Sequence, residues 1–206
     1  VSPGANGRLS AVDVEAADEF FDTADDSSML TLCLEVSIDA VKAAAREAHE
    51  RGARVVLNLS PYAKVGADVL DLADLLVVNA HELADLTEQP DFEPLGDWTA
   101  VVEATRAALG ESGPRTVVVT LGADGARTID LDSGEVSDQI PSPKITPVDT
   151  TGAGDAFLAS LAYRLASGDD LSTACAFAVR VGAYAATGEG AQKSYPTADQ
   201  LENWAP

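Results

Sequence analysis

The sequence has few of the residues from which disulfide frameworks, nucleic-acid surfaces or membrane spans are built. Its two cysteines, Cys33 and Cys175, lie in apolar surroundings, which excludes a disulfide scaffold or a cysteine zinc site. No apolar run reaches the ~18 residues of a membrane helix, and the first residues have neither the basic nor the apolar region of a secretory signal. These absences predict a cytoplasmic protein with reduced thiols and no membrane segment.

Positive charge is scarce as well. Lysine and arginine number 13 against 34 acidic residues, so the 206-residue chain has a net charge of −21. Binding to nucleic acid requires a basic patch that neutralises phosphates, and the sequence contains none. A nucleic-acid partner is therefore excluded. The acidic residues are dispersed among apolar positions, which indicates a folded domain rather than an acidic tail.

Short apolar runs alternate with amphipathic stretches along the chain. The runs predict strands at 28–34, 54–59, 75–79 and 116–120, and a hairpin of 126–130 with 135–140. The stretches predict helices at 38–52, 80–88, 97–109, 153–167, 170–187 and 197–204. Valine and leucine runs without alternation are typical of strands covered on both faces. The pattern predicts one α/β domain over 1–206, a doubly wound, mostly parallel Rossmann-like sheet with helices on both faces.

The strongest local signal is the loop 149–157, Asp-Thr-Thr-Gly-Ala-Gly-Asp-Ala-Phe. Its small side chains leave the amides of 152–155 bare at the start of a predicted helix, which favours anion binding. Asp155 lies in the first turn of that helix. A carboxylate beside an anion site fits phosphoryl transfer to an alcohol, which needs donors for the phosphoryl group and a base for the hydroxyl. A plain helix cap by Asp149 or Thr151 is the alternative.

The whole loop resembles the second signature, D-T-x-G-A-G-D, of the ribokinase-like carbohydrate kinases (the PfkB group). The resemblance implies an ATP-dependent phosphotransferase acting on a primary sugar hydroxyl. It implies that the amides of Gly152, Ala153 and Gly154 bind the γ-phosphate and that Asp155 accepts the hydroxyl proton. Because ATP would approach against a charge of −21, the chain is expected to depend on local cations.

Two further motifs resemble the nucleotide site of this family. Asn79-Ala80-His81-Glu82 matches N-x-x-E, which implies that Asn79 and Glu82 organise Mg²⁺ and its waters; a capping box is the alternative. Thr120-Leu121-Gly122-Ala123-Asp124-Gly125 is similar to T-L-G-x-x-G, which implies that Thr120, Gly122 and Gly125 lie against ATP; a glycine turn between strands is the alternative. By the same resemblance Val179 contacts the adenine ring, unless it belongs only to the core.

A monovalent cation site is also implied by the resemblance. Gly190-Ala191-Gln192-Lys193-Ser194 is similar to the G-A-Q-x-S loop of ribokinases, which holds K⁺ together with the aspartate that begins the signature loop. Oxygen ligands suit this hard ion. The implied ligands are the side chains of two residues and the carbonyls of four more: Asp149 and Ser194, then Thr151, Ala185, Gly188 and Gly190.

The sugar is suggested by the start of the chain. Pro3-Gly4-Ala5-Asn6 and Leu34-Glu35 resemble ribokinases, in which a glutamate at this place reaches the sugar hydroxyls. D-ribose, giving ribose 5-phosphate, is thus the expected substrate, and Glu35 the expected sugar contact; a solvated strand end is the alternative for Glu35. Fructokinase, ketodeoxygluconate kinase and nucleoside kinase are open alternatives, as is a non-catalytic nucleotide- or sugar-binding module.

The resemblance covers the C-terminal two thirds of a family member. The opening strands, the β lid and the sugar-binding Gly-Gly-Lys-Gly-x-Asn loop have no counterpart in residues 1–206. We expect that the chain is part of a longer kinase rather than a natural truncation. Family members often dimerise through the lid, and a homodimer is left open here.

Overall fold

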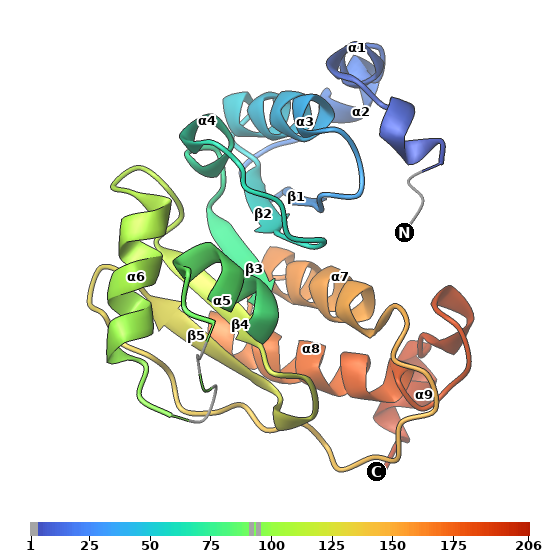
Figure 1. Cartoon of the computed structure of the whole chain (residues 1–206). Coiled ribbons are helices and arrows are strands. Elements are labelled where there is room, and N and C mark those ends of the chain that lie inside the picture. Colours follow the sequence, from blue (N-terminus) through green and yellow to red (C-terminus); the bar gives the residue numbers. More distant parts are fainter. Residues whose placement is uncertain (1–3, 91–92, 94–95) are drawn as a thin grey trace. The chain divides into compact units, whose positions relative to one another are not determined.

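The computed structural model describes residues 4–90, 93 and 96–206, and it is an α/β structure (Figure 1). Its strands are β1 (Met29–Leu32), β2 (Arg54–Asn58), β3 (Leu75–Asn79), β4 (Thr116–Thr120) and β5 (Ala126–Asp130). Its α-helices are α1 (Ala11–Glu15), α2 (Asp18–Phe21), α3 (Ile38–Glu50), α4 (Ala67–Leu70), α5 (Ala80–Thr87), α6 (Thr99–Leu109), α7 (Ala153–Ala166), α8 (Leu171–Ala185) and α9 (Ala198–Glu202). Short 3₁₀ turns occur at Asn6–Arg8, Gly122–Asp124 and Gln192–Ser194.

The five strands form one sheet in the order β1-β2-β3-β4-β5. β1 pairs with β2 and β2 with β3, both in parallel. The middle strands are buried on both faces, because consecutive residues, which point to opposite faces, are both buried in each strand: Val56 and Leu57, Leu76 and Val77, Val117 and Val118. This burial explains why their side chains do not alternate between apolar and polar. The predicted doubly wound α/β architecture is confirmed.

Local signals set the boundaries of the first long helix. The Ser37 hydroxyl accepts a hydrogen bond from the Ala40 amide, so Ser37 is the N-cap of α3 as predicted. The helix is followed by Gly52 at φ +80°, a left-handed conformation that is easy only for glycine. The buried face of α3 consists of Ala40, Val41, Ala44, Ala45 and Ala48. Small side chains on this face allow close packing against the sheet.

The predicted hairpin is only partly correct. β5 is present, but residues 135–140 form two isolated antiparallel bridges, Ala126 with Ile140 and Ile129 with Val136. The pairing slips by one residue between these bridges, which is the signature of a bulge. The Thr128 amide donates to the Ser137 hydroxyl. In a regular antiparallel ladder the acceptor would be a backbone carbonyl. The extra residue therefore prevents a regular second strand.

Contacts divide the chain into two compact units, which are described separately. Unit 1 comprises Val1–Val119 and Thr128–Ser137, and unit 2 comprises Thr120–Arg127 and Asp138–Pro206. The prediction of one domain over 1–206 stays a prediction. None of the helices in the described ranges is long and apolar enough to cross a membrane.

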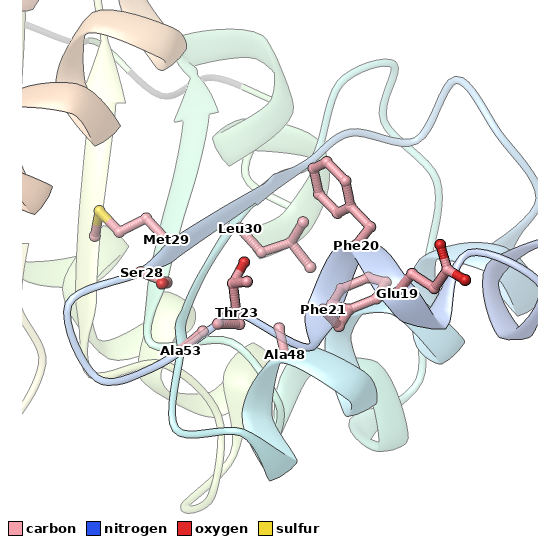
Figure 2. A pocket seen from close by; sticks show the side chains of 10 residues that line it. Glu19, Phe20, Phe21, Thr23, Ser28, Met29, Leu30, Ala48 and Ala53 are labelled. Atoms are coloured by element: carbon pink, nitrogen blue, oxygen red, sulfur yellow. The ribbon is translucent and has the colours of Figure 1, made fainter.

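Unit 1 contains an apolar pocket of about 380 Å³ beside β1, the first strand of the sheet order. Figure 2 shows Phe20 and Phe21 from α2, Leu30 from β1 and Ala48 from α3 around it. Phe21 is buried, whereas Phe20 is 78% exposed. The residues of β1 are half-buried or exposed, unlike those of β2 and β3. This edge of the sheet thus presents apolar surface.

Unit 2 is built on α7 and α8, which pack side by side (Figure 1). Their close approach depends on Gly182, where an added Cβ would lie 3.2 Å from the Ala153 carbonyl oxygen. Ala156, Val181, Ala185 and Leu201 form the buried cluster at one end of the pair. Four partly buried aromatic residues pack against this cluster: Phe177, Tyr184, Tyr195 and Trp204.

Candidate functional site

The signature loop forms a tight turn before α7. Gly152 is the N-cap of the helix and has a left-handed backbone with φ +77° and ψ 0°. A Cβ at this position would lie 2.6 Å from the Tyr195 hydroxyl and 2.9 Å from the Ala191 Cβ. Both the conformation and the crowding require glycine here. The first glycine of the motif is therefore needed for the turn itself.

The second glycine has no such structural requirement. Gly154 lies within the first turn of α7, and a Cβ added to it would meet no atom within 4 Å. Glycine in a helix costs about 0.5–1 kcal/mol relative to alanine. The fold would therefore be more stable with alanine at this position. The open space beside Gly154 is instead what a ligand approaching the backbone would need.

The amides of the turn are less free than predicted. The Ala153 amide donates to the Thr150 carbonyl at 3.1 Å, so the expectation of bare amides throughout 152–155 is wrong at this residue. The bond closes the turn that Gly152 makes possible. Within the described ranges, the amides of Gly152, Gly154 and Asp155 have no acceptor. Three backbone donors thus remain at the positive end of the helix dipole.

Gly154, together with Ala153, lines a cavity of unit 2 with a volume of about 550 Å³, whereas Gly152 and Asp155 flank these two residues in the chain. The cavity brings together five of the predicted nucleotide-site positions: Thr120, Gly122, Gly125, Ala153 and Gly154, with Val179 on α8 as a sixth. Val179 is 6% exposed, so it belongs to the core and also lines the cavity. Most of the remaining lining is apolar or small, which suits the flat ring of a nucleobase.

The glycines after β4 shape one wall of this cavity. Gly125 has φ +92°, and a Cβ there would lie 1.9 Å from the Ile140 carbonyl oxygen, so a side chain would displace the backbone. Gly122 has φ +59° and open space around it. The alternative of a glycine turn thus holds for Gly125. Both glycines nevertheless line the cavity.

Asp155 stands at the start of α7 as predicted. Its side chain is exposed, and it makes no hydrogen bond or ion pair within the described part of the chain. Burial raises the pKa of the neighbouring Tyr195, and the negative charge of the Asp155 carboxylate raises it further. Asp155 is therefore free to accept a hydrogen bond from a ligand hydroxyl.

The segments of the predicted cation site meet through Asp149. Its two carboxylate oxygens accept the amides of Thr151 and Gly190, each at 2.9 Å. A hydrogen bond from the Thr151 hydroxyl, followed by these two amide bonds, lowers the pKa of Asp149 below its usual value. Ser194 is buried, and its hydroxyl donates to the Gly190 carbonyl at 2.7 Å. The loop at 188–194 is thereby tied to the signature loop.

The remaining implied ligands are main-chain oxygens. The Ala185 carbonyl accepts the Gly188 amide at 3.3 Å, so that oxygen has one partner already. Gly188 is needed for packing, because a Cβ would lie 2.9 Å from the Ser194 Cβ. The described residues contain no group of three or more His, Cys, Asp or Glu that could hold a metal ion. Asp149 is the one carboxylate among the implied ligands, and the others are hydroxyl or carbonyl oxygens.

In unit 1, Asn79 and Glu82 form the capping box that was the alternative for N-x-x-E. The Asn79 Oδ1 accepts the amides of His81 and Glu82 at 2.9 Å, and Glu82 Oε2 accepts the Asn79 amide at 2.8 Å. Glu82 is 6% exposed. Within the described part of the chain, the Asn79 side-chain NH₂ and the Glu82 Oε1 have no hydrogen-bond partner. The NH₂ is a donor and suits a phosphate oxygen, whereas only Oε1 suits a metal-bound water.

Glu35, the predicted sugar contact, also lies in unit 1. It is exposed in the turn that follows β1, and it makes no hydrogen bond or ion pair within the described ranges. The preceding Leu34 donates its amide to the Ser60 carbonyl at 2.9 Å, which fixes the backbone of this turn. The carboxylate is thus accessible, as both the sugar contact and the solvated strand end require.

Two residues of the unit 2 site were missed by the sequence analysis. Lys144 is the one charged side chain among the described residues that line the cavity, and only the scarcity of lysine could have pointed to it. Tyr195 donates its hydroxyl to the Gly152 carbonyl at 3.0 Å across 43 positions. No local spacing predicts a contact over that distance.

Comparisons with known proteins agree with this geometry. The family model of the pfkB family carbohydrate kinases matches residues 1–198. A ribokinase of Schizosaccharomyces pombe is 32% identical over 200 residues, covering 96% of this chain and 60% of the relative. A solved ribokinase from Thermotoga maritima has a TM-score of 0.78 at 26% identity, covering 98% of this chain and 62% of that one.

A third relative carries ligands in its solved structure. An aminoimidazole riboside kinase from Salmonella enterica, complexed with aminoimidazole riboside and an ATP analogue, has a TM-score of 0.67 at 30% identity. The match covers 84% of this chain and 61% of that one. The chain therefore spans about three fifths of the length of the relatives described here. Because the family model matches residues 1–198 and the signature turn lies at the cavity, the chain belongs to the pfkB family of carbohydrate kinases.

Proposed function

We propose that this chain carries the phosphoryl-transfer part of an ATP-dependent sugar kinase. The observation that supports it is the cavity of unit 2, which is lined by the unobstructed Gly154; within the described ranges the amides of Gly154 and of the next residue, Asp155, have no acceptor. Backbone donors at a helix start bind phosphate oxygens without further help. The apolar part of the cavity, with Val179, would take the adenine ring.

The proposed reaction joins the γ-phosphoryl group of ATP to a primary sugar hydroxyl. The amides of Gly152, Gly154 and Asp155 would stabilise charge on the equatorial phosphoryl oxygens. Asp155 accepts the hydroxyl proton as the new oxygen–phosphorus bond forms and the bond to ADP breaks. A carboxylate is a weak base for an alcohol, but in a loose transition state the proton moves late, so that positioning contributes most.

Lys144 complements this arrangement electrostatically. A chain of net charge −21 repels ATP as a whole, so local cations must favour binding. Lys144 lies among otherwise uncharged lining residues and would contribute an ammonium group for the nucleotide phosphates. This contribution would weaken as salt screens the charge.

Two metal ions belong to the proposal. Glu82 would hold a water of Mg²⁺ through Oε1 and Asn79 would donate to a phosphate oxygen; the ion, when bound, would supply positive charge for the nucleotide phosphates. K⁺ would be held by the oxygens around Asp149, Gly190 and Ser194, and its charge would reinforce the anion site. The oxygen-only donor set and the joined loops support this assignment. Activation by KCl over NaCl at equal ionic strength tests it; equal rates would refute it.

D-ribose is the substrate we propose, with Glu35 binding its hydroxyls. It is supported by the ribokinase relatives and by the motif at 190–194. A cytoplasmic location is part of the proposal and is supported by the two free thiols, since such cysteines persist in reducing compartments.

Phosphorus NMR of the chain with ATP, MgCl₂ and KCl tests the proposal. Each reaction contains D-ribose, fructose, ketodeoxygluconate or a nucleoside. Formation of ribose 5-phosphate at the highest rate is expected. If the phosphoryl group is transferred faster to another acceptor, that acceptor is the substrate instead of D-ribose. ATP binding without transfer to any of them would refute the kinase assignment of this chain and favour a binding module.

A further inference from the structure

The Gly152 carbonyl of the signature turn is held by two donors. The Ala156 amide donates to it at 2.9 Å as the first bond of α7, and the Tyr195 hydroxyl donates to it at 3.0 Å. The other end of the same peptide unit is also engaged, because the Ala153 amide donates to Thr150. The Gly152–Ala153 peptide plane is thus fixed on both sides, immediately before the free amides of Gly154 and Asp155.

Tyr195 is itself well anchored. It follows the 3₁₀ turn Gln192–Ser194, in which the buried Ser194 hydroxyl donates to the carbonyls of Gly190 and Ala191 at 2.7 and 2.6 Å. Its ring packs against the buried cluster that joins α7, α8 and α9. The hydroxyl position is therefore set by packing rather than by a mobile side chain.

The same loop binds the signature turn at both ends. The Gly190 amide donates to Asp149 at the beginning of the turn, and Tyr195 donates to Gly152 at its end. The fit at Gly152 leaves no spare room, because an added Cβ would lie 2.6 Å from the tyrosine oxygen.

We propose that Tyr195 is a positioning residue for phosphate binding: it holds the Gly152 carbonyl so that the amides of Gly154 and Asp155 face the terminal phosphate. The inference rests on the proposed function, because it requires ATP in the cavity of unit 2. Tyr195 would thereby contribute to a higher affinity for ATP than for ADP, since only ATP has a phosphate at this turn. The residue does not touch the substrate; it acts through the turn.

The test is the substitution Tyr195→Phe, which removes the hydroxyl and keeps the ring in the cluster. Tyr184→Phe is the matched control, because Tyr184 belongs to the same cluster, stacks edge-on against Trp204 and makes no side-chain hydrogen bond within the described ranges. Calorimetry measures the affinities of the whole chain for ATP and ADP in the presence of Mg²⁺. The ATP affinity of Tyr195→Phe should fall about fivefold, the effect of one neutral hydrogen bond, with unchanged ADP affinity.

The split between the two nucleotides separates positioning from a merely structural role. General loosening of unit 2 would weaken ATP and ADP alike, whereas lost positioning lowers only the preference for ATP. If the wild-type chain prefers ATP and Tyr195→Phe keeps that preference, the inference is wrong and the proposed function stands. If the wild-type chain binds ATP no better than ADP, or binds neither, the phosphate-binding turn and the inference are both wrong.

Discussion

Gly154→Ala should make the protein more stable and its ATP binding weaker. The added methyl group meets no atom of the protein within 4 Å, so it causes no clash. Replacing glycine by alanine in a helix stabilises it by about 0.5–1 kcal/mol. For a chain of this size 1 kcal/mol corresponds to about 2–4 °C in melting temperature. Thermal unfolding should therefore shift upward by about that amount.

The same methyl group would occupy the space from which a phosphate reaches the amides of Gly154 and Asp155. We expect the affinity for ATP to fall about tenfold, or about 1.4 kcal/mol. Adenosine lacks phosphates and should bind as it does to the wild-type chain. Gly152→Ala is the contrasting variant: its left-handed backbone and the 2.6 Å approach to Tyr195 predict destabilisation instead.

Calorimetric titration with ATP and adenosine, together with thermal melts, gives all of these quantities. The reasoning is refuted if Gly154→Ala is more stable and binds ATP with unchanged affinity, because the glycine would then serve no ligand. A loss of adenosine binding as large as that of ATP would also contradict it, since the methyl group would then be disturbing the whole cavity.

Two further predictions concern charge. The pKa of Asp149 is lowered, first by the Thr151 hydroxyl and then by the amides of Thr151 and Gly190. These bonds therefore stabilise the fold fully at a pH above the usual carboxyl pKa. The stabilisation is lost as the pH falls through the lowered pKa of the folded state. Urea unfolding should therefore show Asp149→Ala less stable than wild type at pH 7 and the difference shrinking toward pH 3; a constant difference would contradict this. Lys144→Met should weaken ATP binding at low salt and flatten its dependence on KCl, whereas Lys64→Met, in unit 1, should not; identical salt dependence in both variants would exclude Lys144 from nucleotide binding.

The long elements of the fold could be predicted because each carries a strong local signal. The run Val117–Val119 is wholly buried, and the strand predicted at 116–120 agrees with β4. Caps were equally informative, since Ser37 and Asn79 accept the amides that their positions predicted. At α6 the Asp97 carboxylate does accept the Thr99 amide, although the N-cap is Trp98, so the helix begins one residue later than a cap at Asp97 predicts.

Short elements and long-range contacts could not be predicted in this way. The helices α1, α2 and α4 have four or five residues each, too few to display a helical period. The bulge opposite β5 depends on a one-residue slip in pairing that no local motif encodes. At the site, the motif located Gly152 and Gly154, but tertiary contacts decided that the Ala153 amide is engaged and that Tyr195 holds the turn.

The most direct test of phosphoryl transfer at this site is the turnover of Asp155→Asn beside that of Asp170→Asn. The second variant makes the same chemical change at the start of α8, where Asp170 caps the helix. If Asp155 accepts the hydroxyl proton, its substitution should lower turnover about 10²–10⁴-fold, as for other general bases, with ATP affinity nearly unchanged. Turnover of Asp155→Asn equal to that of the wild-type chain and of Asp170→Asn would contradict the assignment.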